Sequence, residues 1–229
     1  PNRSIRLTRR HPPWNMKIKI HPQNVPLARK IAIVKRANSA AWKKGNYIKQ
    51  AQVAYRDSYR RILVFNSKGV MAEDKQVRTL LTVMVVAGND IILRGYETAG
   101  GLVGIEIFDE RPPENVARTA AERALKMLTA MKAPGGTMPV VLSSSAGGTM
   151  IHEAVGHGLE ADHIQEGTSV YSGKIGKKVA SGLITVLDDA TIPGKRGSFS
   201  FDDEGVPAQR TILIENGILK GYIHSLLTA

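Results

Sequence analysis

Residues 51–65 read AQVAYRDSYRRILVF, and this stretch decides the fold class of the first half of the chain. From Val53 and Tyr55 onward, alternate side chains belong to opposite faces, which is the period-two pattern of a β-strand. Similar patterns over residues 79–87 and 91–96 are separated by a Gly-Asn-Asp turn. We therefore expect an antiparallel sheet whose strands follow one another along the chain.

Two helical patterns flank these strands. Residues 25–44 place apolar side chains three or four positions apart among Lys and Arg, and Gly45 ends the pattern. A second helix is predicted from Pro112 and Pro113, because proline is tolerated in a first turn. The expected buried faces consist of Leu27, Ile31, Val34 and Ala37, and of Val116, Ala117, Ala120, Ala124, Leu128 and Met131. The APGG sequence at residues 133–136 predicts a domain boundary.

The second half of the chain has shorter elements. Residues 138–142 are continuously apolar and predict a strand, and the serines that follow are N-cap candidates for a helix reaching about residue 162. A strand is expected at 183–187, and a hairpin at 211–222, where Asn-Gly suits a type I′ turn. The expected regions are a basic extended segment and helix at 1–49, an α+β domain at 50–135 and the start of a second domain at 136–229.

The charge of the chain is unevenly distributed. Residues 1–65 hold 16 Lys and Arg against one acid, whereas the net charge of the whole chain is +12. This region begins with an extended basic segment that includes Arg3. Such a region could attract nucleic acid, but no nucleic-acid motif accompanies it, so a solvated helix face is the preferred interpretation. No apolar run predicts a membrane span or a secretory signal. The absence of cysteine gives no disulfide framework and favours the cytoplasm.

The strongest chemical signal is HEAVGH at residues 152–157. Zinc peptidases present two metal ligands and a general base on a helix in this way, with two histidines and a glutamate beside the first. His152 and His157 are five residues apart, which separates them by about 140° on a regular α-helix. A π-bulge would widen the turn and bring them together, and Gly156 lowers the cost of that distortion. The alternative is that both are ordinary residues of an amphipathic helix.

Peptidase zinc sites have a third protein ligand and an open position for water. His163, six residues after His157, is one candidate, and Glu160 and Asp162 are oxygen alternatives. For all three, an ordinary role as a last-turn histidine or a solvated acid is the preferred interpretation.

Six sequence blocks resemble the TldD/PmbA family of metalloproteases, once labelled modulators of DNA gyrase. The resemblance is dense over residues 140–222 and diffuse from about residue 50. Its blocks are HEAVGHGLEAD at 152–162, GTSV at 167–170, LDD at 187–189, RGS at 196–198, DDEGVP at 202–207 and LIENGILKG at 213–221. Six blocks in one order are far more specific than the six-residue motif.

The resemblance implies an α+β fold, with an antiparallel-sheet N-terminal domain with helices and a β-rich C-terminal domain that carries the metal-binding helix. It implies a TldD-type zinc peptidase acting on unfolded or flexible peptides, as a homodimer or a heterodimer with a PmbA/TldE-type subunit. Zinc would be held by His152 and His157, with Glu153 as the base. The family's third ligand is a downstream cysteine, and this chain has none. We therefore interpret the chain as a fragment truncated at both ends, with an incomplete metal site.

Weaker expectations concern residues around the motif. Gly167, Thr168 and Ser169 could line the substrate, because an extended peptide pairs well with an exposed strand. Four aspartates could orient the ligand imidazoles, although solvated turn acids are preferred for most of them; they are Asp188, Asp189, Asp202 and Asp203.

Other functions stay open. A catalytically silent partner subunit would have no need to keep His152, Glu153 and His157, and a basic DNA-associated factor would show steep salt dependence. A peptidase of the dipeptidyl-peptidase III type shares the five-residue spacing, but we find no acidic ligands for it on a following helix. The sequence leaves open the natural substrate, the cleavage preference and the oligomeric partner.

Overall fold

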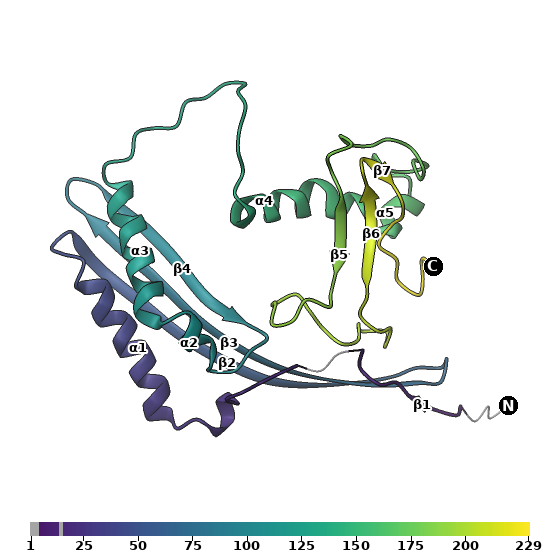
Figure 1. The fold of residues 1–229 in the computed structure, drawn as a ribbon, viewed down its shortest axis with the longest axis horizontal. Helices are drawn as coiled ribbons and strands as arrows, with labels where there is room; N and C mark the ends of the chain where they lie inside the picture. Colours follow the sequence, from purple (N-terminus) through teal and green to yellow (C-terminus); the bar gives the residue numbers. More distant parts are fainter. Residues whose placement is uncertain (1–4, 14–15) are drawn as a thin grey trace.

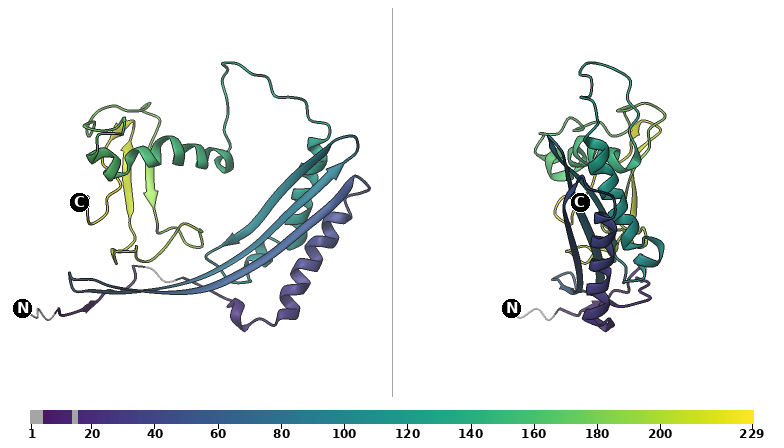
Figure 2. Two further views of the ribbon diagram at one scale, coloured as in Figure 1. Left: turned by 180° about the vertical axis from the view of Figure 1, so that it is seen from behind. Right: turned by 90° about the vertical axis from the view of Figure 1, so that its left-hand side faces the viewer.

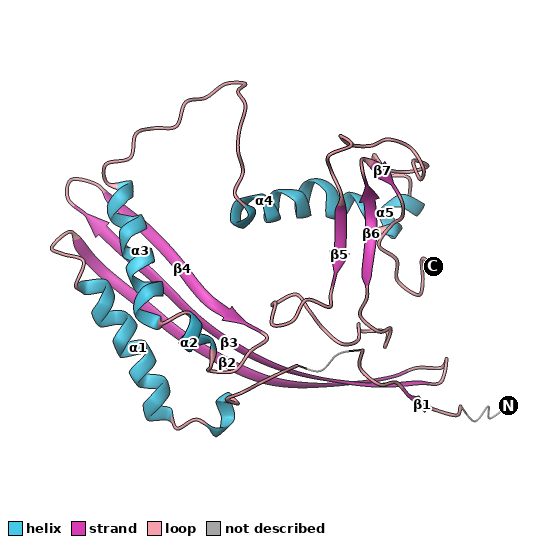
Figure 3. Ribbon diagram, in the orientation of Figure 1, coloured by secondary structure: helices cyan, strands magenta, loops and turns pink. Residues whose placement is uncertain are grey.

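The computed structural model describes residues 5–13 and 16–229. Arg3, part of the predicted extended start, lies outside the described residues. Figure 1 shows a long curved sheet with helices along it, and a smaller part that holds one interrupted helix and three short strands. A connection over residues 128–143 joins α3 to α4 between the two parts. The predicted α+β class is confirmed (Figure 3).

The large sheet is the antiparallel arrangement that the period-two pattern predicts. Its strands are β2 (Ile48–Phe65), β3 (Val70–Gly88) and β4 (Ile92–Gly101), and β3 lies between the other two. The short strand β1 (Thr8–Arg9) runs parallel to the start of β3. All three long strands extend beyond the ranges that the sequence pattern predicts, because their backbone ladders continue through residues outside the alternating apolar pattern, including the buried polar residues Asp74 and Gln76 of β3.

Three helices cover this sheet, namely α1 (Leu27–Trp42), α2 (Ile107–Glu110) and α3 (Pro113–Met127), and the turn η1 (Pro22–Asn24) precedes α1. One core joins α1 and α3 to β3, so the helix within residues 1–49 packs with the strands that follow it. Small side chains allow a close approach: a Cβ at Gly95 of β4 would lie 2.0 Å from the carbonyl oxygen of Ala120 in α3.

The prediction of which α1 side chains are buried is partly wrong. Leu27 and Ile31 are exposed, whereas Ile33, Ala37, Ala40 and Ala41 are buried. The face that packs is the one with small side chains, because α3 lies close beside α1. Met131, expected on the buried face of the second helix, lies beyond its end and is exposed.

Acids from other elements balance part of the basic charge of residues 1–65. Ion pairs join Lys30 to Asp57 at 2.6 Å and Arg61 to Glu73 at 2.8 Å. Two further pairs join α1 to α3, namely Arg36–Glu114 and Lys44–Glu122. These contacts support a structural role for several of the basic residues.

The smaller part contains the interrupted helix, made of α4 (Ser144–Ile151), η2 (His152–Gly156), η3 (His157–Leu159) and α5 (Ala161–Gln165). Its antiparallel sheet has the order β5 (Val186–Asp189), β6 (Arg210–Glu215) and β7 (Ile218–Leu219). Asn216 and Gly217 have φ angles of 48° and 79°, which confirms the predicted turn with two left-handed residues.

The strand predicted at residues 138–142 is wrong. These residues form no strand, and Val141 is fully exposed. An apolar run becomes a strand only where another strand pairs with it, and none within the described part of the chain lies beside this one.

A long loop, residues 190–209, returns from the smaller part to the large sheet (Figure 2). The amide of Leu102 donates to the carbonyl oxygen of Gly194 at 3.0 Å, and the amide of Ser200 donates to Asp74 Oδ2 at 3.2 Å. Asp74 is 6% exposed and also accepts from Gln76 Nε2 at 2.9 Å. The two parts of the molecule are therefore connected by hydrogen bonds as well as by the chain. Over the residues described, none of the helices has the length and apolar character of a membrane span.

Candidate metal centre

The interrupted helix that carries the HEAVGH motif, called the motif helix below, has a widened turn at the motif. Residues His152–Gly156 form a π-helix, and the amide of His157 donates to the carbonyl oxygen of His152, five residues earlier. A regular α-helix would bond that amide to the fourth residue back. The widened turn predicted from the five-residue spacing is thus confirmed.

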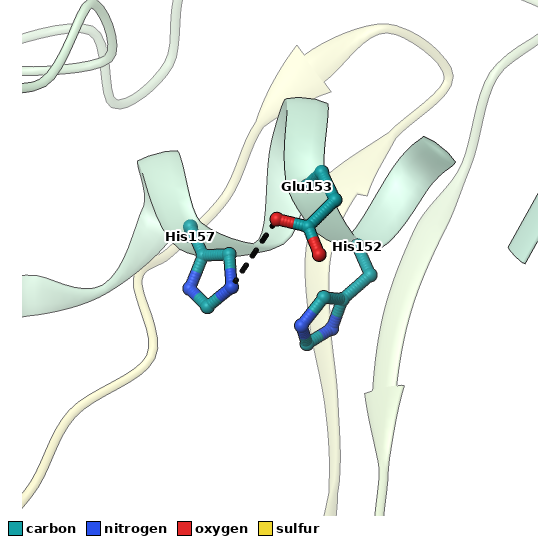
Figure 4. Close-up of side chains that lie close together, drawn as sticks. All are labelled: His152, Glu153 and His157. Atoms are coloured by element: carbon teal, nitrogen blue, oxygen red, sulfur yellow. Dashed lines mark ion pairs between the residues drawn. The ribbon is translucent and has the colours of Figure 1, made fainter. Parts of the chain in front are cut away.

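The two imidazoles meet because of this turn. Their ring centroids lie 4.6 Å apart with an angle of 74° between the planes. His152, Glu153 and His157 each offer a ligand atom, and these atoms lie within 4.8 Å of one another. Figure 4 shows the three side chains gathered beside the helix, and all three residues are solvent-exposed.

Glu153 lies close to His157 without a hydrogen bond to it. Its Oε2 is 3.7 Å from His157 Nε2, which is beyond hydrogen-bond distance. Its side chain is 64% exposed. A carboxylate in this place can take a proton from a water molecule that approaches both rings.

Glu160 contacts the other nitrogen of His157. Its Oε1 is 2.9 Å from His157 Nδ1, and its Oε2 is 3.6 Å from His163 Nε2. Glu160, Asp162 and His163 form a second group of possible ligands, and His163 does not join the first group among the described residues. Sequence reasoning treated Glu160 as an oxygen ligand or a solvated acid and missed this contact, although a separation of three residues on a helix is a signal for it.

The end of the motif helix is fastened to the adjacent chain segments. Leu159 is fully buried, its carbonyl oxygen accepts from the amide of Ile223 at 2.8 Å, and the amide of Ala161 donates to the carbonyl oxygen of Ile223 at 2.9 Å. Gly158 packs so closely that a Cβ there would lie 2.9 Å from the ring of Tyr171. These contacts fix the backbone just after His157, although the side chain of His157 is exposed.

Gly167, Thr168 and Ser169 form a turn after α5 rather than the edge of a strand. Thr168 Oγ1 donates to the carbonyl oxygen of His163 at 3.2 Å, and Ser169 Oγ donates to that of Gly158. The two hydroxyls thus support the motif helix. Substrate binding by these three residues stays a prediction.

The four aspartates fit the preferred interpretation as turn acids better than the alternative in which they orient the ligand imidazoles. In the described chain none of them bonds to His152 or His157. Asp189 accepts from the amide and hydroxyl of Thr191, and Asp202 accepts from the amides of Glu204 and Val206. Burial raises the pKa of Asp188, and the neighbouring Asp189 adds to this. Asp203 is exposed. Asp189 and Asp202 thus shape turns, which is the ordinary role of such acids.

The donor set fits a zinc ion. Two imidazole nitrogens and a nearby carboxylate are ligand types that zinc accepts, and the rings converge from one short segment. His152 and His157 would hold the ion, and the exposed position leaves room for a further ligand and for water.

Two protein-family models match the chain. Residues 20–128 match the central domain of PmbA/TldA metallopeptidases, and residues 135–229 match their C-terminal domain. A metalloprotease of Methanothermobacter thermautotrophicus is 37% identical over 209 residues, covering 91% of this chain and 45% of the relative. A metalloprotease TldD homolog of Haemophilus influenzae is 36% identical, with coverages of 88% and 43%.

Solved structures show the same fold. A putative modulator of a DNA gyrase from Thermotoga maritima matches with a TM-score of 0.82 at 24% identity, over 94% of this chain and 49% of that one. TldE from Thermococcus kodakarensis matches with a TM-score of 0.63 at 17% identity, over 97% and 50%. The chain spans about half the length of the relatives that it matches.

Proposed function

The chain belongs to the PmbA/TldD family of metallopeptidases, and from this premise we propose that it carries the catalytic helix of a zinc-dependent peptidase of the TldD type. His152 and His157 hold the metal, and Glu153 acts as the general base. The observation that carries the proposal is the π-turn at His152–Gly156, which brings two histidines five residues apart to a ring distance of 4.6 Å.

The π-turn supports a metal site because it has a conformational cost. Such turns are rare in proteins and are frequent at functional sites. Without a ligand to hold, the same residues could continue as a regular α-helix with the two rings pointing apart. The need to present both nitrogens to one ion explains the irregular backbone.

Each residue of the motif then has a distinct chemical task. Bound zinc supplies Lewis acidity toward a peptide carbonyl. Glu153 is adjacent to the first ligand and near the second, so its carboxylate accepts the proton of the attacking water and delivers it to the leaving amine. Gly156 belongs to the π-turn, where the absence of a side chain lowers the cost of the widened backbone.

The substrate and the assembly follow from the family and are part of the proposal. The substrate is a peptide in an unfolded or flexible segment, as the family resemblance implies, and the motif residues are exposed to solvent where it would bind. Gly167–Ser169 lie next to the motif helix and are proposed to border the substrate. The protein acts as a homodimer or with a TldE-type subunit, and the fold shared with TldE supports the second arrangement.

Zinc titration of single-histidine variants tests the metal site. We expect His152→Ala and His157→Ala to lose most zinc binding, because each removes one of two imidazole ligands. His224→Ala is the matched control, since His224 is an exposed histidine outside both groups of possible ligands. Equal zinc binding by the parent and the His152→Ala variant would contradict the proposal.

A further inference from the structure

The two ring nitrogens of His157 face two different carboxylates. Nδ1 lies 2.9 Å from Glu160 Oε1, and Nε2 lies 3.7 Å from Glu153 Oε2. Only the first distance is that of a hydrogen bond. The ring therefore has one nitrogen engaged by Glu160 and the other free on the side of His152 and Glu153.

This arrangement decides where the ring proton sits. A neutral imidazole has one N–H donor and one nitrogen with a lone pair, and a carboxylate can only accept. The hydrogen bond to Glu160 therefore requires the proton on Nδ1. The lone pair is then on Nε2, which is the nitrogen that points toward the proposed metal site.

The backbone places Glu160 for this contact. Its φ and ψ of −67° and 130° are those of an extended residue, which separates η3 from α5. Its amide donates to the carbonyl oxygen of His157 at 3.3 Å, and it forms a bridge to Ile223. On the other side of the carboxylate, His163 Nε2 lies 3.6 Å from Oε2. The Glu160 carboxylate thus lies between two imidazoles and is hydrogen-bonded to that of His157.

We infer that Glu160 is a positioning residue that holds His157 with its proton on Nδ1 and its Nε2 lone pair toward the metal, and that it is not a metal ligand. The inference rests on the proposed metal site at His152 and His157. A carboxylate behind a ligand histidine fixes the orientation of the ring and raises its basicity, and loss of such a partner typically weakens metal binding by about 10- to 100-fold.

The geometry separates this role from direct coordination. Glu160 belongs to a group with Asp162 and His163, whereas the atoms of His152, Glu153 and His157 gather as another group. To reach the ion, Glu160 would have to leave Nδ1 of His157 and cross to the opposite side of the ring. The contact at 2.9 Å holds it where it supports the ligand instead.

The position of the ring proton can be measured directly in the metal-free chain. Long-range ¹H–¹⁵N correlation spectra distinguish the two neutral forms of histidine, at about pH 8, above the usual imidazole pKa of ~6.5. We expect His157, assigned with a His157→Gln variant, to carry its proton on Nδ1 in the parent. Glu160→Ala should move it largely to Nε2, whereas Glu160→Gln should keep it on Nδ1, because the amide oxygen still accepts.

Metal affinity gives the second measurement. We expect Glu160→Ala to bind zinc about 10- to 100-fold more weakly than the parent and Glu160→Gln to lose less than about 10-fold. Glu166→Ala is the matched control: it removes an exposed acid whose side chain forms no hydrogen bond or ion pair within the described residues. With cobalt in place of zinc, the visible spectrum of the Glu160→Gln complex should match that of the parent, because the coordination sphere is unchanged.

The possible outcomes are distinguishable. A His157 proton on Nε2 in the parent, or zinc affinity of Glu160→Ala within about 3-fold of the parent, would overturn the inference. A changed cobalt spectrum in Glu160→Gln would show that Glu160 is a ligand and would also overturn it. Unaltered zinc binding by His152→Ala would instead overturn the proposed metal site, while the proton position of His157 in the metal-free chain would still decide the role of Glu160.

Discussion

The amide of His157 donates to the carbonyl oxygen of His152, and this bond across five residues is what makes the two imidazoles neighbours. The metal site therefore depends on the backbone of the turn as much as on the side chains. The backbone in turn depends on the segment that follows, where Leu159 is buried and Gly158 packs against Tyr171.

Gly158→Ala tests this dependence. A Cβ at Gly158 would lie 2.9 Å from the ring of Tyr171, so we expect the variant to be destabilised by about 1–3 kcal/mol and to bind zinc more weakly. Gly148→Ala is the matched control, because Gly148 lies in α4, outside the π-turn, and its Cβ would have no such heavy atom within 4 Å. Urea unfolding and zinc titration of both variants provide the comparison, and equal behaviour of the two would contradict the packing argument.

Asp74→Ala tests the connection between the two parts of the molecule. It removes a buried acceptor for the amide of Ser200 and for Gln76 Nε2, which should cost about 1–3 kcal/mol of stability. We expect faster proteolysis within residues 190–209, because the loop loses a contact with the sheet. Asp74→Asn should be milder, since it keeps an acceptor oxygen, and Asp203→Ala is the exposed control. Unchanged proteolysis in Asp74→Ala would argue against a tethering role.

The acid sensitivity of the N-terminal core is expected to depend on Glu106. Partial burial acts to raise the pKa of this carboxyl, but N–H donors, among them the amides of Lys19, Ile20 and Gly104, outweigh it and lower the pKa. A lowered pKa in the folded state gives stability that is present above the unfolded pKa of about 4.3 and is lost as pH falls through the folded value.

Replacing Glu106 by Gln should therefore flatten the loss of stability on acidification. Thermal unfolding followed from about pH 6 to about pH 3 should show a shallower slope for the variant than for the parent, together with lower stability near neutral pH. Glu110→Gln, an exposed acid of the same short helix, should leave the slope unchanged. Identical slopes for the parent and Glu106→Gln would contradict the assigned role.

Local patterns predict the irregular turn and part of the core, for identifiable physical reasons. The five-residue spacing of His152 and His157 leaves only a widened turn if both are to reach one ion, so the π-helix could be predicted from spacing alone. The long strands follow from alternation over many residues. Asn216-Gly217 forms its turn because both residues tolerate positive φ.

The missed features depend on contacts between segments far apart in the chain. Residues 138–142 are apolar but have no neighbouring strand in the described chain, so they stay extended and exposed. Leu27 and Ile31 repeat correctly for a helix, but the sheet and α3 lie against the alanine face instead. The Asp74–Ser200 bond joins residues 126 positions apart, and no local pattern indicates it.

The central claim is that Glu153 performs proton transfer while His152 and His157 hold the metal. Glu153→Gln leaves both imidazoles and the π-turn in place, because the amide has nearly the same shape as the carboxylate. The variant should therefore retain zinc and lose most peptide hydrolysis, since general-base assistance is typically worth about 10²- to 10⁴-fold.

The most direct measurement determines zinc content and peptide hydrolysis side by side on the Glu153→Gln, His152→Ala and His157→Ala variants, in a protein of the length of its relatives. We predict that Glu153→Gln contains zinc at the level of the parent and hydrolyses peptide at least about 100-fold more slowly, and that both histidine variants lose zinc and activity together. Hydrolysis by Glu153→Gln within a few-fold of the parent, with zinc fully retained, would contradict the account.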